Sequence, residues 1–142
     1  MTTLLFVLFL LAAPVPSSLE EVRAEPNPEH RARAAVEYAA VAEKNAEAAY
    51  AKGDMGSVRA ELKNTEESLE TAQQSLTASG KTPGRNPGPY KYAELHSREI
   101  LIRLGDLEEK MDVSERDPVE RVKAKVQAIH DAWFDGIMNR RR

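Results

Sequence analysis

The sequence of 142 residues contains no cysteine, few aromatic residues and no dominant charge. Without cysteine there is no disulfide, no covalently attached c-type haem, no iron–sulfur cluster, no thiolate zinc site and no cysteine nucleophile. The 20 basic and 23 acidic residues give a formal net charge of −3. Because phosphate neutralisation needs clustered lysine and arginine, this composition argues against a nucleic-acid partner.

Aromatic residues account for 6% of the chain, whereas apolar residues total 42% and include many alanines. A core built from such residues needs helices that approach one another closely. No segment alternates strictly between apolar and polar residues, and β-branched residues recur at helical spacing, so no strand is expected. One compact domain is the expectation for a chain of this length.

The N-terminal 24 residues have the pattern of a signal peptide. Residues 4–13 read LLFVLFLLAA, an apolar run of about ten residues, which suits a signal-peptide core and falls short of the ~20 residues that span a membrane. Val22 and Ala24 put small residues at the −3 and −1 positions of a cleavage site after Ala24, and a cut after Ala13 is the alternative. The first three residues depart from the pattern because they include no lysine or arginine.

This N-terminal pattern predicts export. We expect a periplasmic or secreted protein without a stable membrane anchor, in which residues 25–142 form a single helical domain. No cysteine follows the apolar run to carry a lipid. An exported domain without cysteine rests on packing alone, since no disulfide helps to hold it.

Two long helices are expected in the first half of this domain. Helix 28–52 begins with Asn27 as its N-cap and a proline at its first position. Helix 55–79 follows directly, because Gly53-Asp54 supplies a left-handed turn residue and the next cap. The connection is so short that the two helices must be antiparallel neighbours.

The facing sides of these two helices carry complementary stripes. On helix 28–52 alanine recurs at spacings of three and four residues, at Ala32, Ala35, Ala39, Ala42, Ala46 and Ala49. On helix 55–79 mostly larger residues recur at the same spacings, at Val58, Leu62, Thr65, Leu69, Ala72 and Leu76. Small residues opposite large ones allow the two helices to approach closely.

A second pair of helices is expected after a helix-breaking linker. Residues 80–89 contain three prolines and three glycines, which forbids a helix there. Helix 90–111 then presents an apolar face made of Leu95, Leu101, Ile102, Leu104, Leu107 and Met111. The last helix begins at Asp117, which acts as its cap and forms a capping box with Glu120. Its stripe consists of Val119, Val122, Val126, Ile129, Trp133 and Ile137.

The predicted fold class is therefore all-α, with four long helices in two antiparallel hairpins that form a four-helix bundle or a short tetratricopeptide-like solenoid. Residues 25–79 carry 6 basic and 10 acidic groups, a net charge of −4, whereas residues 80–142 carry 13 and 11, a net charge of +2. These opposite net charges favour attraction between the two hairpins, either within one chain or between two chains. The alternative is that the charged residues simply lie on solvated helix faces. The alanine stripe also suits a homodimer.

One segment carries a family resemblance. Ala49-Tyr50-Ala51-Lys52-Gly53-Asp54, followed by Val58, Leu62 and Thr65, resembles the middle of a tetratricopeptide repeat, in which a tyrosine precedes a Gly-Asp turn. The resemblance covers roughly 20 residues and implies a helical hairpin. The layout as a whole looks like that of secreted helical proteins of bacteria, which implies an envelope location.

Three histidines are candidate metal ligands. In an up-down bundle, His30, His96 and His130 lie near the same end, where they could converge with neighbouring carboxylates. Neither an i, i+4 histidine pair nor a Glu-x-x-His motif is present, so the di-iron bundle pattern is absent.

Three aromatic residues are candidates for contact with a partner. Tyr90 and Tyr92 follow the linker and form either an exposed aromatic patch or a staple at the start of a helix. Phe134 adjoins Trp133, and the two cannot both lie at the centre of one stripe, so one of them sits at the edge of the core, where it packs or binds a partner.

No motif points to catalysis. The sequence lacks Gly-x-Ser-x-Gly, a phosphate-binding loop and a dinucleotide-binding fingerprint, and its adjacent carboxylates diverge around helices. We therefore expect no cofactor and a non-enzymatic exported protein that acts through protein–protein contacts, as a scaffold, an adaptor or a small periplasmic chaperone. The alternative is a helical bundle that binds a metal or another small ligand.

Overall fold

The computed structural model describes residues 16–139, and over this range the chain forms helices and no strands. In chain order these are α1 (Leu19–Ala24), α2 (Pro28–Ala51), α3 (Met55–Ala78), α4 (Pro87–Lys110), a short 3₁₀ turn (Val113–Glu115) and α5 (Asp117–Met138). The prediction of an all-α fold with four long helices is confirmed. The apolar run at 4–13 and the arginines at 140–142 lie outside the described residues.

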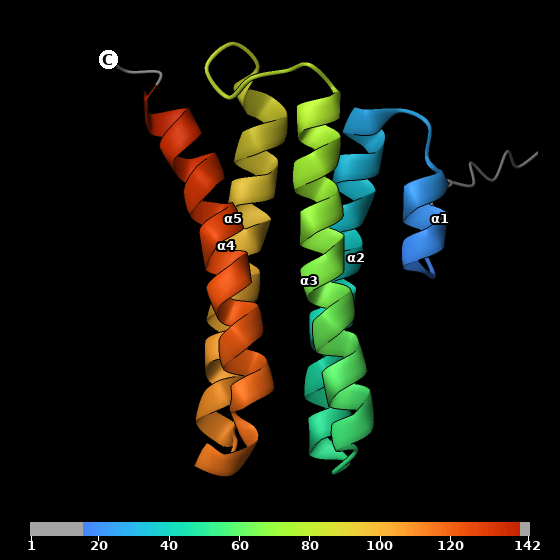
Figure 1. Ribbon diagram of the computed structural model, residues 1–142, viewed down its shortest axis with the longest axis vertical. Coiled ribbons are helices and arrows are strands. Elements are labelled where there is room, and N and C mark those ends of the chain that lie inside the picture. The colour runs from blue at the N-terminus through green and yellow to red at the C-terminus, as the bar shows by residue number, and fades with distance from the viewer. Residues whose placement is uncertain (1–15, 140–142) are drawn as a thin grey trace, which may run out of the picture.

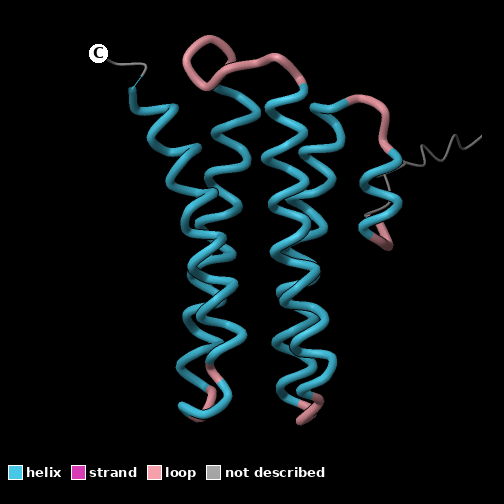
Figure 2. The backbone as a smooth tube through the Cα atoms, in the orientation of Figure 1, coloured by secondary structure: helices cyan, strands magenta, loops and turns pink. Residues whose placement is uncertain are grey.

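The four long helices form two antiparallel hairpins that stand side by side (Figure 1). Helices α2 and α3 make one hairpin and α4 and α5 the other, while α2 packs against α4 and α3 against α5. The arrangement is thus an up-down-up-down four-helix bundle. The short helix α1 lies along the outside of α2, and the longest connection, residues 79–86, loops over the end of the bundle (Figure 2).

The α2–α3 hairpin follows the sequence pattern closely. All six alanines of the α2 stripe and all six stripe residues of α3 are buried. Asn27 caps α2 by accepting hydrogen bonds from the backbone N–H groups of Glu29 and His30, and Asp54 caps α3 by accepting one from Ser57. Gly53 has a φ of +73°, the left-handed conformation expected where one helix ends and the next begins. These predictions are confirmed.

One predicted helix start and one predicted helix cap are wrong. Helix α4 begins at Pro87, inside the predicted linker, because Pro87 and Pro89 occupy its first turn, where a missing N–H costs nothing. Asp117 is the first residue of α5 and makes no capping bond, so the capping box with Glu120 is not formed. The preceding 3₁₀ turn leads straight into α5, and Arg116 already has helical backbone angles, which leaves no extended residue to cap.

The buried face of α4 also differs from the prediction. Leu95 and Ile102 were expected in the core, yet they are 46% and 60% exposed. They lie seven residues apart, on the side of α4 opposite to its buried residues. That buried side includes the small residues Ala93 and Ser97, which are followed by Ile100, Leu104 and Leu107. Close packing of the two hairpins therefore relies on small residues in α4 as well as in α2.

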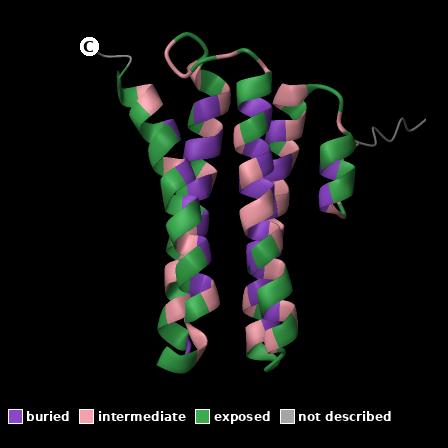
Figure 3. Ribbon diagram, viewed as in Figure 1, coloured by how far each residue is buried: buried purple, intermediate pink, exposed green. Residues whose placement is uncertain are grey.

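Buried residues recur along all four long helices (Figure 3), and several of them are polar. Buried hydroxyl groups bond to carbonyl oxygens of their own helix, as Thr65 does to Glu61 and Thr71 to Glu67. Such side chains fit a tight interior without leaving a polar group unpaired. Over the described residues, no helix has the length and hydropathy needed to cross a membrane.

Candidate functional site

A groove of about 390 Å³ lies between the first halves of α2 and α4. Both helices begin at the same end of the bundle, so their first turns are neighbours (Figure 1). The apolar lining is Ala32, Val36, Leu76, Pro89 and Ala93, and the polar rim is Glu29, His30, Arg33 and Tyr92, with Gly88 beside them. Small residues on both helices leave this space open, since a larger side chain at Ala32 or Ala93 would fill it.

The rim of the groove is held by a connected set of polar contacts. The Arg33 guanidinium lies 4.5 Å from the centroid of the Tyr92 ring, and its Nε donates to Glu37 at 3.3 Å. The Tyr92 hydroxyl donates to the same Glu37 oxygen at 3.1 Å. Burial, together with the charge of Glu37, raises the pKa of Tyr92, so this hydroxyl stays a neutral donor. Arg33 itself remains largely exposed and available to an anion.

The other acidic group on the rim is already paired. Glu29 forms an ion pair with Lys81 of the 79–86 loop. This pair ties the loop to the first turn of α2. Arg33, which is exposed although its Nε pairs with Glu37, is therefore the cation at the mouth of the groove, with the exposed His30 beside it.

The three histidines do not form the shared site that the sequence suggested. His30 lies on the groove rim, and His96 packs against Tyr92 in a tilted arrangement with ring centroids 4.2 Å apart. His130 instead lies between α4 and α5, bonded to Glu94. Within residues 16–139, no group of three or more His, Asp or Glu side chains is placed to hold a metal ion.

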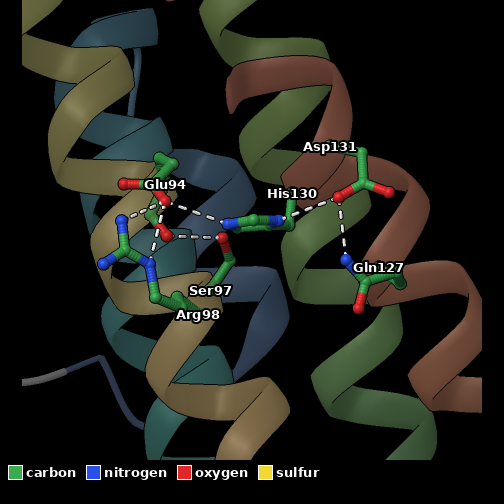
Figure 4. Close-up of polar contacts among 6 residues, drawn as sticks. All are labelled: Glu94, Ser97, Arg98, Gln127, His130 and Asp131. Carbon is green, nitrogen blue, oxygen red and sulfur yellow. Dashed lines mark hydrogen bonds and ion pairs between the residues drawn. The ribbon is translucent and has the colours of Figure 1, made fainter. Parts of the chain in front are cut away.

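His130 belongs to a polar cluster that ties α5 to α4 (Figure 4). Its Nε2 lies 2.9 Å from Oε1 of Glu94, which also accepts from Nε of Arg98 at 3.0 Å. Its Nδ1 lies 3.1 Å from Oδ1 of Asp131, which accepts a hydrogen bond from Gln127. Both ring nitrogens are thus engaged, and little of the imidazole is exposed.

The carboxyl group of Glu94 is held ionised. Burial alone would raise its pKa, but the hydrogen bonds from Arg98 and His130 outweigh burial and lower it. Glu94 and His130 at the centre of the cluster are largely buried, whereas Arg98 and Asp131 at its edges are exposed. Its geometry fits a fixed link between two helices.

The aromatic candidates have different surroundings. Tyr90 is buried, and its hydroxyl donates to the Lys81 carbonyl at 2.6 Å, which fastens the 79–86 loop to α4. Tyr92 is half-buried on the groove rim. Phe134 is 42% exposed and stacks on His130 with ring centroids 6.1 Å apart. Of the three, Tyr92 alone lines the groove.

The structure contains a second polar cluster, which the sequence did not predict. Glu43 and Glu47 of α2 both accept hydrogen bonds from Arg103 of α4, and Glu43 is fully buried. A signal was present, because Val36, Glu43 and Tyr50 are spaced seven residues apart beside the alanine stripe. That spacing marks a column of α2 that faces the second hairpin.

No protein-family model, curated protein or solved structure matches this chain. The likeness of residues 49–65 to a tetratricopeptide repeat therefore stays a prediction. The site has to be interpreted from its own geometry and chemistry.

Proposed function

We propose that this is an exported, non-enzymatic helical protein that binds a partner protein through the groove between α2 and α4. The observation that carries the proposal is the pairing of an apolar floor with an exposed cation, Arg33, at the mouth. Apolar clefts with a few placed polar groups are the usual form of a binding site. No catalytic motif occurs in the sequence, which supports a binding role.

The groove also suggests the chemistry of the partner. Its volume of about 390 Å³ lies at the small end of the range for ligand sites, which suits one or two apolar side chains of a protein segment. Arg33 and His30 lie exposed on the rim and can donate to a carboxylate beside those side chains, although Arg33 already pairs with Glu37 through its Nε. Glu29 does not oppose this charge, because it is paired with Lys81. We therefore expect a segment in which a large apolar residue adjoins Asp or Glu. A small organic anion with an apolar body is the alternative occupant.

Charge reversal at the rim tests the binding site. We expect Arg33→Glu to weaken binding of an apolar–acidic peptide by about tenfold or more, because an attraction becomes a repulsion. Lys44→Glu is the matched control, since Lys44 is an exposed residue of the same helix outside the groove lining. The peptides are selected from a displayed library on the wild-type protein, and their affinities are measured by titration calorimetry.

Three outcomes of this experiment are distinct. Equal binding to the wild type and to Arg33→Glu would show that the groove is not the peptide site. Equal losses in both variants would show an effect of net charge only. A library without binders, together with a retained small molecule in native mass spectrometry, would favour the small-ligand alternative.

Export has its own test, which also locates the cleavage site. A cut after Ala24 removes α1, whereas a cut after Ala13 leaves it in place. Because Leu19 and Val22 of α1 are buried in the core cluster with α2 and α3, we now expect the cut after Ala13. The intact mass of protein recovered from a bacterial periplasm distinguishes the two cuts. Recovery of the uncleaved chain from the cytoplasm alone would contradict export.

A further inference from the structure

The two hairpins are joined across α2 and α4 by a group of three charged residues, of which one is fully buried. Arg103 donates from Nε to Glu43 Oε2 at 2.7 Å and from Nη2 to Glu47 Oε2 at 2.8 Å. Glu43 is fully buried, whereas Arg103 and Glu47 are partly exposed. One guanidinium thus serves two carboxyl groups that belong to successive turns of the same helix.

One oxygen of this group lacks a partner. Oε1 of Glu43 is buried and forms no hydrogen bond with any group of residues 16–139. A buried carboxylate oxygen without a donor is costly, and a second carboxylate beside it adds repulsion. A proton on Glu43 removes both penalties, because a neutral carboxylic acid needs no counter-charge and can donate to Glu47.

In the part of the chain that the structure describes, Arg103 of α4 and Glu47 of α2 itself are the charged groups that act on Glu43. The buried face of α3, the other long helix packed on α2, carries no titratable residue. The buried residues of α1 are Leu19 and Val22, which are not titratable either.

We propose that Glu43 and Glu47 share a titrating proton that acts as a latch between the hairpins, holding α2 against α4 when bound and loosening them when released. Burial and the neighbouring carboxyl group of Glu47 raise the pKa of Glu43 to about 7. Release therefore takes place near neutral pH, within the range that an exported protein encounters. The latch does not depend on what the groove binds.

The direction of the pH effect follows from linkage. Because the folded pKa of Glu43 lies above its ordinary value of 4.5, the folded state binds this proton more tightly than the unfolded state does. The resulting stabilisation is complete below pH 4.5 and is lost as the pH rises through about 7. Between pH 5 and pH 8.5 the folding equilibrium constant should fall by about 70-fold through this group.

Glu43→Gln is the direct test, because glutamine has the shape of the protonated acid. We expect the folding equilibrium constant of the variant to equal that of the wild type at pH 5. At pH 8.5 the variant should not show the 70-fold fall in this constant that is expected of the wild type. Urea unfolding measured by circular dichroism at a series of pH values gives both equilibrium constants. Titratable groups outside Glu43, Glu47 and Arg103 have the same surroundings in both proteins, so their contributions cancel in the difference. Parallel pH profiles for the two proteins would overturn the proposal.

The latch itself is tested by a distance across the two hairpins. The absence of cysteine allows spin labels at Ala48→Cys and Asp106→Cys, exposed sites on α2 and α4. We expect the inter-label distance to lengthen or broaden from pH 5 to pH 8.5, and to stay fixed when Glu43→Gln is added. Labels at Ala48→Cys and Arg59→Cys, within the first hairpin, are the control and should not respond.

Two further results bear on the latch. If the α2–α4 distance follows the α2–α3 control at every pH, the proton does not govern the contact between hairpins and the proposal fails. If Glu43→Gln does not fold, Glu47→Gln takes its place, because it leaves Arg103 paired with Glu43 alone. We then expect a smaller pH dependence than in the wild type, and an unchanged one would overturn the proposal.

Discussion

Replacing Trp133 with alanine is expected to lower the free energy of unfolding by about 3–5 kcal/mol. Trp133 is 3% exposed and continues the buried stripe of α5 after Ile129. It is the sole tryptophan in a chain whose core consists largely of alanine, valine and leucine. Its removal would leave a cavity, and small neighbours on rigid helices have little freedom to fill it.

Phe134→Ala is the matched control for this substitution. Phe134 is the next residue of the same helix and is 42% exposed, so its loss should cost about 1 kcal/mol or less. Urea unfolding followed by circular dichroism compares the two variants without relying on tryptophan fluorescence. Equal costs would mean that Trp133 does not lie at the centre of the α5 contact.

Long periodic stripes made the first hairpin predictable. The alanines of α2 and the larger residues of α3 recur at helical spacing over the whole length of both helices, and all are buried. Gly53 and Asp54 then fix the turn by local chemistry alone. Trp133 was placed in the α5 stripe for the same reason. In these elements, local preference and tertiary packing agree.

Helix α4 shows where this reasoning fails. Hydrophobicity alone favours Leu95 and Ile102 as core residues, and both are seven residues apart, as a stripe requires. The bundle instead turns Ala93 and Ser97 inward, because the hairpins lie close together and small residues fit that contact. Hydrophobic periodicity alone does not identify core positions that are occupied by small residues because space is limited there.

The candidate sites could not be predicted from the sequence for a related reason. The groove exists because α2 and α4 begin at the same end and carry small residues there, and this depends on how the hairpins dock. The spacing of Val36, Glu43 and Tyr50 did indicate a second buried column on α2. The role of this column could not be inferred without Arg103, which binds Glu43 from another helix 60 residues away in the sequence. The three histidines do not converge as predicted, because His130 lies in the contact between α4 and α5.

Two buried carboxyl groups in this bundle have opposite pKa shifts. Burial tends to raise the pKa of both Glu43 and Glu94. Glu94 receives hydrogen bonds from Arg98 and His130, and these lower its pKa, so its stabilising effect is lost only as the pH falls below 4.5. Glu43 shares one arginine with Glu47, and its stabilising effect is lost as the pH rises. The number of donors for each carboxylate decides the direction of its pKa shift.

Enlarging the alanine stripe should separate the two helices of the first hairpin. We expect Ala42→Leu to lower the free energy of unfolding by about 1–3 kcal/mol, because a tight contact accommodates added methyl groups only by moving backbone. Ala42 is fully buried on the side of α2 that faces α3. That orientation is marked by Arg31, three turns earlier on the same side, which donates to Ser75 of α3.

Ala48→Leu isolates packing from helix propensity in this comparison. Ala48 is exposed on the opposite side of α2, and alanine and leucine have similar helix propensities, so this variant should stay within about 0.5 kcal/mol of the wild type. Chemical denaturation of the three proteins under the same conditions gives the difference. If Ala42→Leu leaves the free energy of unfolding unchanged, α2 and α3 can move apart without cost. The alanines would then not be needed for close approach of the two helices. A cost confined to Ala42→Leu would mean that the narrow interior limits side-chain size, and the same limit explains why α4 turns Ala93 and Ser97 inward.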